Sequence, residues 1–254
     1  MGAGLATAIG AGISFAVMLT HFFSSRNTLH ICRPLAFFTK LKSIIVTGFS
    51  TFFIDAAMGI LTVFFNRQIM KYLGTNALSV YSIIVNISTF VQCCAYSVGQ
   101  AAQPVISINF GAGKFRRIRE TLKYSLITAA FFSVLWFFLT MAFPNGFVRI
   151  FMDPTEEVLK IAPSIIRSYC ISFLLLPLNI FSTYYFQSLM KPAASFLISV
   201  ARGLVISGIA IYLLPALLGA DALWFAMPLT ELIVAAAVII LMVKYTGNLK
   251  KGKF

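Results

Sequence analysis

The sequence predicts an all-α membrane protein with about seven transmembrane helices. Of its 254 residues, 59% are hydrophobic and only 11% are charged, whereas soluble domains carry about 25% charged and about 45–50% apolar residues. Apolar stretches long enough to cross a bilayer recur along the whole chain. The basic residues lie mainly in alternate connections between these stretches, as they do in multi-pass membrane proteins.

The expected spans follow from the length of about 20 residues that a transmembrane helix needs. They cover residues 2–23, 44–66, 77–106, 122–143, 164–189, 194–218 and 222–243. The first has neither the basic start nor a convincing cleavage site of a signal peptide, and its glycines and alanines are typical of a closely packed membrane helix. A chain that starts inside such a span suggests further sequence upstream.

Local signals mark the ends and bends of several spans. Asp153-Pro154-Thr155-Glu156 has the form of a capping box, which predicts a helix with Asp153 as its N-cap. Lys191-Pro192 predicts a tight turn between antiparallel helices. Pro104, Pro177 and Pro228 fall within or beside spans, where each removes a backbone N–H and bends the helix.

The connections set the orientation. If the segment after the first span is cytoplasmic, fourteen basic residues lie inside and four lie outside, which is the positive-inside pattern of a plasma-membrane protein with a cytoplasmic C-terminus. The inside residues are Arg26, Arg33, Lys40, Lys42, Lys114, Arg116, Arg117, Arg119, Lys123, Lys191, Lys244, Lys250, Lys251 and Lys253. The net charge of +13 therefore indicates contact with membrane lipid, not with nucleic acid.

The glycines beside this basic group do not form a phosphate-binding loop. Such a loop needs G-x-x-x-x-G-K followed by Ser or Thr. For Gly113-Lys114 the required positions hold Ile108 and Phe115. The dinucleotide-binding pattern fails as well, since no strand precedes it and a third glycine is missing at the right spacing.

The sequence also lacks the motifs of an enzyme or a metal protein. The two histidines lie near the first connection, and no H-E-x-x-H or G-x-S-x-G pattern occurs. The four cysteines have no metal or disulfide spacing. We expect no catalytic residue, no metal site and no cofactor.

Two acidic residues lie inside expected spans and are candidates for cation coupling. Asp55 lies near the middle of 44–66, where an aspartate costs about 2.5–3.5 kcal/mol on insertion scales. Glu231 lies about a third of the way into 222–243. Intramembrane ionisable residues are functional candidates by default. The alternatives are that Asp55 only packs and that Glu231 reaches water at the interface.

Polar residues recur on single faces of three expected spans, which predicts a substrate cavity. The stripe on 77–106 is the longest, and its members are three or four residues apart. The alternative is that these side chains only hold helices together, at about 0.6–2 kcal/mol per hydrogen bond. The predicted lining residues are Thr62, Asn66, Asn86, Cys93, Gln100, Gln103, Asn179 and Thr183.

The run FNRQIMKYLGTNALSVYSIIVNISTFVQCCAYSVGQAAQPVISINFGAGKFRRIRETLK strongly resembles the multidrug and toxic compound extrusion (MATE) transporters. The most specific part runs from Gln100 to Arg119, through Gln-Pro and an Asn-Phe-Gly-Ala-Gly turn into the basic connection. IFMDPTEEVLKIAPSIIRSY and LWFAMPLTELI look like later segments of the same family, including the tryptophan and glutamate of its final helix.

The resemblance implies about twelve transmembrane helices in two six-helix lobes. Residues 1–23 would be the last helix of the first lobe, 24–43 the cytoplasmic connection, 44–243 the second lobe and 244–254 a basic cytoplasmic tail. It also implies efflux of organic, often cationic, compounds driven by Na⁺ or H⁺, with a first lobe needed for activity. Asp55 stands at about the position of a coupling carboxylate that is glutamate in several relatives.

Two other hypotheses remain. One is a flippase of the wider superfamily that moves a lipid-linked precursor, whose cavity would need basic residues for a pyrophosphate. Arg167 and Arg202 near span ends form no central cationic cluster, which favours drug export. The other is a truncated product without activity of its own, which the DNA immediately upstream would decide.

Overall fold

The computed structural model describes residues 2–23 and 37–251, and this part of the chain is helical without a strand. The chain divides into two compact units, Met1–Thr47 and Gly48–Phe254. The first unit contains α1 (Gly2–Leu19), which ends in a 3-10 turn over Thr20–Phe23, and the start of α2 (Phe37–Tyr72).

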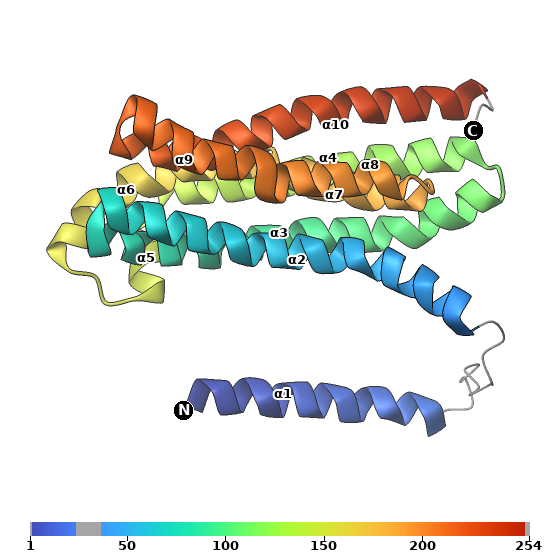
Figure 1. The fold of residues 1–254 in the computed structure, drawn as a ribbon, viewed down its shortest axis with the longest axis horizontal. Coiled ribbons are helices and arrows are strands. Elements are labelled where there is room, and N and C mark those ends of the chain that lie inside the picture. Colours follow the sequence, from blue (N-terminus) through green and yellow to red (C-terminus); the bar gives the residue numbers. More distant parts are fainter. Residues whose placement is uncertain (1, 24–36, 252–254) are drawn as a thin grey trace. The chain divides into compact units, whose positions relative to one another are not determined.

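The second unit is an up-and-down bundle formed by the rest of α2 and eight further α-helices (Figure 1). These are α3 (Gly74–Gly111), α4 (Phe115–Ala142), α5 (Pro144–Phe151), α6 (Glu156–Cys170), α7 (Leu176–Ser188), α8 (Pro192–Val200), α9 (Ile206–Leu218) and α10 (Ala226–Lys251). The connections after α3 and α7 lie at one end of this bundle, together with the end of α10, and those after α2 and α9 lie at the other. This is the alternation that successive membrane spans require.

Six of the seven expected spans correspond to membrane-length helical stretches, most of which are longer than predicted. Six stretches of the described residues are long and apolar enough to cross a membrane: Gly4–Phe23, Gly74–Gly111, Phe115–Ala142, Glu156–Ser188, Pro192–Leu218 and Ala220–Gly247. The remaining expected span, 44–66, lies within α2. The expected external connection after 122–143 contains an additional short helix, α5.

Three spans depart from regular α-helix. A 3-10 turn over Ile171–Leu174 separates α6 from α7, next to Pro177. A π-helical turn over Ala201–Val205 joins α8 to α9. A 3-10 segment over Ala220–Phe225 precedes α10, close to Pro228. Backbone that leaves the α-helical pattern at membrane depth is tolerated where it is buried in protein or lines a cavity.

The helix boundaries correct one expectation and explain one motif. The N-cap of α6 is Thr155, not Asp153: the Thr155 hydroxyl accepts from the Val158 N–H at 3.4 Å, and Glu156 and Glu157 occupy the first turn, where the helix dipole favours them. At the end of α3, Gly113 has φ +66° and the Lys114 N–H donates to the Asn109 carbonyl at 2.8 Å. This glycine therefore terminates a helix through the left-handed conformation.

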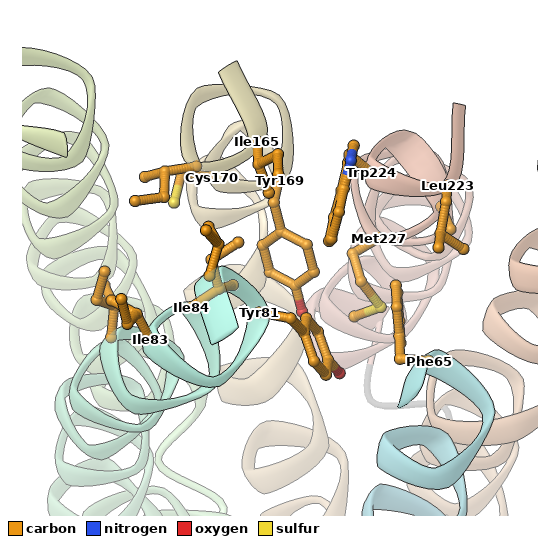
Figure 2. Packing of buried hydrophobic residues seen from close by; sticks show 14 of the residues in the cluster. Phe65, Tyr81, Ile83, Ile84, Ile165, Tyr169, Cys170, Leu223, Trp224 and Met227 are labelled. Carbon is orange, nitrogen blue, oxygen red and sulfur yellow. The ribbon is translucent and has the colours of Figure 1, made fainter. Parts of the chain in front are cut away.

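One hydrophobic core of the second unit contains a group of packed aromatic rings, which we call the aromatic cluster (Figure 2). Phe65 of α2 stacks on Tyr81 of α3, with 4.9 Å between ring centroids, and both rings contact Tyr169 of α6 edge-on. Trp224, from the 3-10 segment before α10, lies 6.5 Å from Tyr81. Four segments distant in sequence thus meet in one packed group, and aromatic pairs contribute about 0.5–1.5 kcal/mol each beyond the area they bury.

A second hydrophobic core contains the buried aromatic residues of α7. Phe181, Tyr185 and Phe186 are fully buried, and α7 packs most extensively against α3 and also against α4, α8 and α10. The Tyr185 hydroxyl is 2.7 Å from Thr246 Oγ1 of α10. Because α7 contacts helices on several sides, its polar residues are held at fixed positions.

Candidate substrate cavity and interior ion pair

A single ion pair lies inside the described part of the second unit. Arg202, on the π-helical turn, donates from Nε to Glu231 Oε1 of α10 at 2.7 Å. The Glu231 side chain is fully buried, whereas that of Arg202 is 12% exposed. We call Arg202–Glu231 the interior ion pair. Removing two charges from water is costly, so such a pair persists only with good geometry and further hydrogen bonds.

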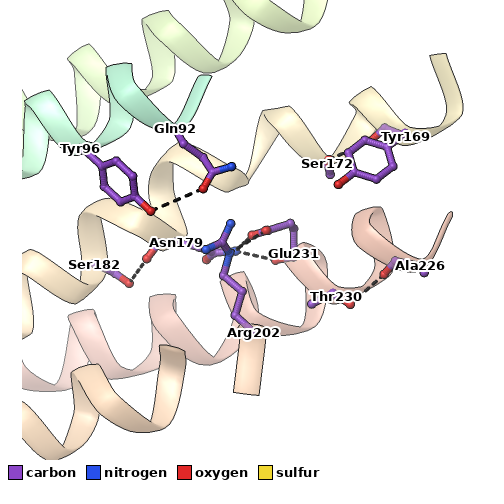
Figure 3. A network of polar contacts seen from close by, with 10 residues as sticks. All are labelled: Gln92, Tyr96, Tyr169, Ser172, Asn179, Ser182, Arg202, Ala226, Thr230 and Glu231. Carbon is purple, nitrogen blue, oxygen red and sulfur yellow. Dashed lines mark hydrogen bonds and ion pairs between the residues drawn. The ribbon is translucent and has the colours of Figure 1, made fainter. Parts of the chain in front are cut away.

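Asn179 of α7 supplies the further hydrogen bonds. Its Nδ2 donates to Glu231 Oε2 at 2.6 Å and to the Glu231 backbone carbonyl at 2.9 Å. Figure 3 shows the three side chains converging from different helices. Both carboxylate oxygens of Glu231 therefore have donors, one charged and one neutral, and the acid is held in a fixed orientation.

All three residues lie beside the departures from α-helix. Asn179 follows the 3-10 turn and Pro177, Arg202 is on the π-helical turn, and Glu231 is three residues after Pro228. π-turns occur frequently at functional sites because they change the direction of a side chain and free backbone groups. Arg202 is thus part of an irregular turn, whereas Asn179 and Glu231 lie in the first two turns of the regular helices that follow the 3-10 segments.

A cavity of about 320 Å³ lies against this ion pair. We call it the polar cavity. Its walls come from α2, α3, α7, α8 and the π-helical turn, and they combine amides, hydroxyls, aromatic rings and one guanidinium. The lining residues are Met58, Tyr96, Gln100, Ile180, Thr183, Tyr184, Gln187, Ser199, Arg202 and Gly203.

A smaller cavity of about 100 Å³ adjoins it, sharing Met58 and Arg202. Thr62 of α2 and Gln92 of α3 contribute polar groups to this second space, next to Phe65 and Tyr169 of the aromatic cluster. The Tyr96 hydroxyl, on the wall of the polar cavity, donates at 3.5 Å to Oε1 of Gln92, on the wall of the smaller one (Figure 3). Arg202 therefore lines both cavities.

Two glycines permit the close packing around the polar cavity. A Cβ at Gly99 of α3 would lie 2.7 Å from Cγ of Tyr184, so only glycine leaves room for this ring. A Cβ at Gly203 would lie 3.3 Å from the Cβ of Ala57, where the π-helical turn approaches α2. Small residues at such contacts let membrane helices approach closely.

The predicted site residues occupy different places. Gln100 and Thr183 line the polar cavity and Thr62 lines its neighbour. Asn179 and Glu231 lie behind the cavity wall, bonded to each other. The other predicted lining residues are absent from both lining sets: Asn86 and Cys93 are exposed on α3, and Asn66 and Gln103 are half-buried.

Asp55 belongs to α2, but its side chain lies outside the described residues. It precedes Met58 by three residues, a spacing that places two helical positions on one face. Its proposed role in cation coupling stays a prediction.

Sequence reasoning missed Arg202 as a site residue and placed it near a span end. The structure corrects this: Arg202 lies within the membrane-length stretch Pro192–Leu218 and is paired to Glu231. The rule that singled out Asp55 and Glu231, an ionisable residue inside an apolar run, would have found it too. Tyr184 was also missed, because an aromatic residue in an apolar span gives no signal of a cavity.

Comparisons with known proteins agree on one family. The MatE family model matches residues 49–214. The Bacillus subtilis (strain 168) protein named "Probable multidrug resistance protein YoeA" is 19% identical over 178 residues, which is 68% of this chain and 38% of that protein. The chain therefore spans well under half the length of this curated relative.

Solved structures share the fold. A MATE crystal structure in the straight conformation is 16% identical with a TM-score of 0.81, covering 94% of this chain and 55% of that one. A MOP superfamily transporter from Pyrococcus furiosus, described as having a binding pocket of reverse polarity that suggests a different function, is 16% identical with a TM-score of 0.79, covering 94% and 54%. With the family model matching more than half of its residues, this chain belongs to the MatE family.

Proposed function

We propose that the protein exports organic compounds across the plasma membrane by secondary active transport, with Na⁺ or H⁺ moving in the opposite direction. The observation that carries this is the polar cavity of about 320 Å³, whose wall combines neutral polar, aromatic and apolar side chains with one guanidinium, that of Arg202. Ligand pockets of about 300–1,000 Å³ combine apolar walls with a few placed polar groups. Because the chain spans about half of its solved relatives, the proposal includes a first lobe contributed outside these residues.

Cation coupling is proposed for Asp55 and Glu231. For Glu231 the mechanism has a specific requirement: Arg202 occupies one carboxylate oxygen at 2.7 Å, so an incoming cation competes with the guanidinium. A cation can shift a two-state equilibrium only through its different affinity for the two states. Breaking and remaking the interior ion pair would provide that difference, while Asp55 would act on the α2 side of the cavity.

The test is transport by the full-length protein in liposomes, with Na⁺ and pH gradients imposed separately. Asp55→Asn removes the charge at nearly constant shape and is expected to abolish gradient-driven transport while leaving expression and substrate binding intact. Asp55→Glu should keep part of the activity. Glu120→Gln, at an exposed carboxylate of α4, is the matched control and should transport normally. Normal gradient-driven transport by Asp55→Asn would exclude Asp55 from coupling.

Orientation is proposed with the basic connection after α3 and the C-terminal tail in the cytoplasm. Cysteine labelling should find positions 40, 117 and 250 accessible from the inside and positions 71 and 156 from the outside. Labelling of position 117 from the outside would reverse the orientation.

A second candidate function is movement of a lipid-linked precursor across the membrane. The observation that favours it is Arg202, a guanidinium on the wall of two interior cavities, since a pyrophosphate needs a cationic partner. A flippase assay with a fluorescent polyprenyl pyrophosphate in the same liposomes separates the two functions.

A further inference from the structure

We propose that the polar cavity binds the anionic end of an amphiphilic organic molecule, with the Arg202 guanidinium as its partner. The ligand class is an aromatic or alkyl compound that carries a carboxylate, sulfonate or phosphate. The inference rests on the proposed transport function and specifies its substrate class, in contrast to the cationic compounds that the family resemblance implies.

The first reason is the unequal access to the two charges of the interior ion pair. Glu231 is fully buried, whereas Arg202 is 12% exposed and lines both cavities. A molecule in the polar cavity therefore meets the guanidinium while the carboxylate lies behind it. Among the described lining residues of the two cavities none is acidic, so a cationic ligand would face Arg202 without a compensating charge on these walls.

The second reason is the hydrogen-bonding capacity of Arg202. Its bond to Glu231 is made by Nε, and a guanidinium carries four more N–H donors on its two terminal nitrogens. These donors have the fork geometry that carboxylates and phosphates accept in pairs, with bonds about twice as strong as those between neutral groups. Asn179 meanwhile donates to the other oxygen of Glu231, so the carboxylate does not depend on Arg202 alone.

The third reason is the composition of the remaining walls. The Tyr184 ring, held against α3 at Gly99, and the side chains of Met58 and Ile180 provide apolar surface. Gln100, Gln187 and Thr183 provide neutral donors and acceptors. An apolar body with one charged end fits this division, because its body packs on Tyr184 while its anionic group reaches the Arg202 end of the cavity.

The experiment measures binding, not transport, so that its outcome is independent of coupling. The full-length protein is placed in nanodiscs of zwitterionic lipid, and two probes with the same ring and opposite charge are compared by equilibrium dialysis. They are naphthalene-2-sulfonate and its 2-trimethylammonium analogue. The sulfonate should bind more tightly, and a preference for the trimethylammonium probe would overturn the proposal.

The variants isolate the guanidinium. Arg202→Gln alone leaves Glu231 as an uncompensated buried charge and can prevent folding, so the Arg202→Gln/Glu231→Gln double variant carries the test. Its affinity for the sulfonate should fall about ten- to hundredfold, the factor expected for lost charge-assisted hydrogen bonds. Glu231→Gln should keep or increase that affinity. Arg167→Gln, at an exposed arginine that donates to the Met141 carbonyl, is the matched control and should bind like the wild type.

A final arm identifies the source of the anion. Nanodiscs with increasing phosphatidylglycerol should displace the sulfonate if lipid headgroups enter the cavity, and should leave it bound if the ligand is a soluble anion. Either result supports an anion site. Unchanged sulfonate binding by the folded double variant would refute it. Binding without gradient-driven transport would refute the proposed function and leave the site intact.

Discussion

Two Arg–Glu ion pairs among the described residues share their chemistry but differ in position, distance and exposure. Arg116 and Glu120 lie one turn apart at the start of α4, 3.1 Å from each other, with side chains 88% and 54% exposed. Arg202 and Glu231 come from different spans, are 2.7 Å apart, and are 12% and 0% exposed. The first pair lies among the basic residues at a helix end, and the second inside the bundle against a cavity.

The comparison distinguishes two roles of charged residues: exposed ones influence the orientation of the protein in the membrane, and buried ones stabilise contacts between helices. The exposed pair is solvated and screened, and such pairs contribute at most about 1 kcal/mol. The interior ion pair is held by Asn179 on one side and faces the polar cavity on the other. The basic residues around α4 contribute to membrane orientation through their position. Inside the bundle, the bond between Arg202 and Glu231 itself contributes to stability.

The largest expected effect comes from breaking the interior ion pair. Arg202→Gln or Glu231→Gln alone should lower the free energy of unfolding by about 3–5 kcal/mol, because each leaves a buried charge without its partner. The double variant should recover most of that loss. Reversible unfolding in mixed micelles gives the three values. A double variant as unstable as the sum of the singles would mean that the two residues act independently.

A smaller effect is expected from the neutral partner. Asn179→Leu keeps the approximate volume but removes the donor to Glu231 Oε2, and should cost about 1.5–3 kcal/mol, the range for hydrogen bonds to charged groups. The loss should be smaller when Glu231 is also Gln, where the charge-assisted bond is absent and the bond to the backbone carbonyl remains. If the full loss persists there, Asn179 stabilises the bundle by packing and through the backbone carbonyl, and not through the acid.

The packing that positions Arg202 can be compared with that of the basic region by two glycine substitutions. Gly203→Ala places a Cβ 3.3 Å from that of Ala57 and should cost about 1–3 kcal/mol, because the π-helical turn has to move from α2. Gly111→Ala, at the end of α3 with nothing within 4 Å, should be neutral or stabilising by up to about 1 kcal/mol. Equal effects of the two substitutions in thermal unfolding would contradict this account.

The smallest effect is expected at the surface. Arg116→Gln should change the free energy of unfolding by less than about 0.5 kcal/mol, and the change should vanish in high salt. A loss of more than 1 kcal/mol that persists in salt would show that the exposed pair contributes as the interior one does.

The spans could be predicted from the sequence because bilayer thickness fixes their length and composition. Glu231 could be found for a related reason, as an acid inside an apolar run. Its contact with Arg202 could not, since it depends on how two spans are rotated, and the π-helical turn that rotates them has no sequence signature here. The lining of the cavity was predictable only in part. Gln100 and Asn86 share one stripe of α3, but only Gln100 lies at the level where Gly99 admits Tyr184.

The interior ion pair also has a consequence for biosynthesis. Arg202 is made 29 residues before Glu231, a delay of about 1.5–6 s at common translation rates. During this interval Arg202 lacks the acid with which it pairs in the bundle, and the one other acid of this hairpin, Asp221, lies in the 3-10 segment after α9. Gly219, with φ +94°, makes the sharp reversal between α9 and the segment that leads into α10. The two spans can enter the bilayer together with Arg202 and Glu231 paired, which avoids exposing either of these two charges to lipid alone.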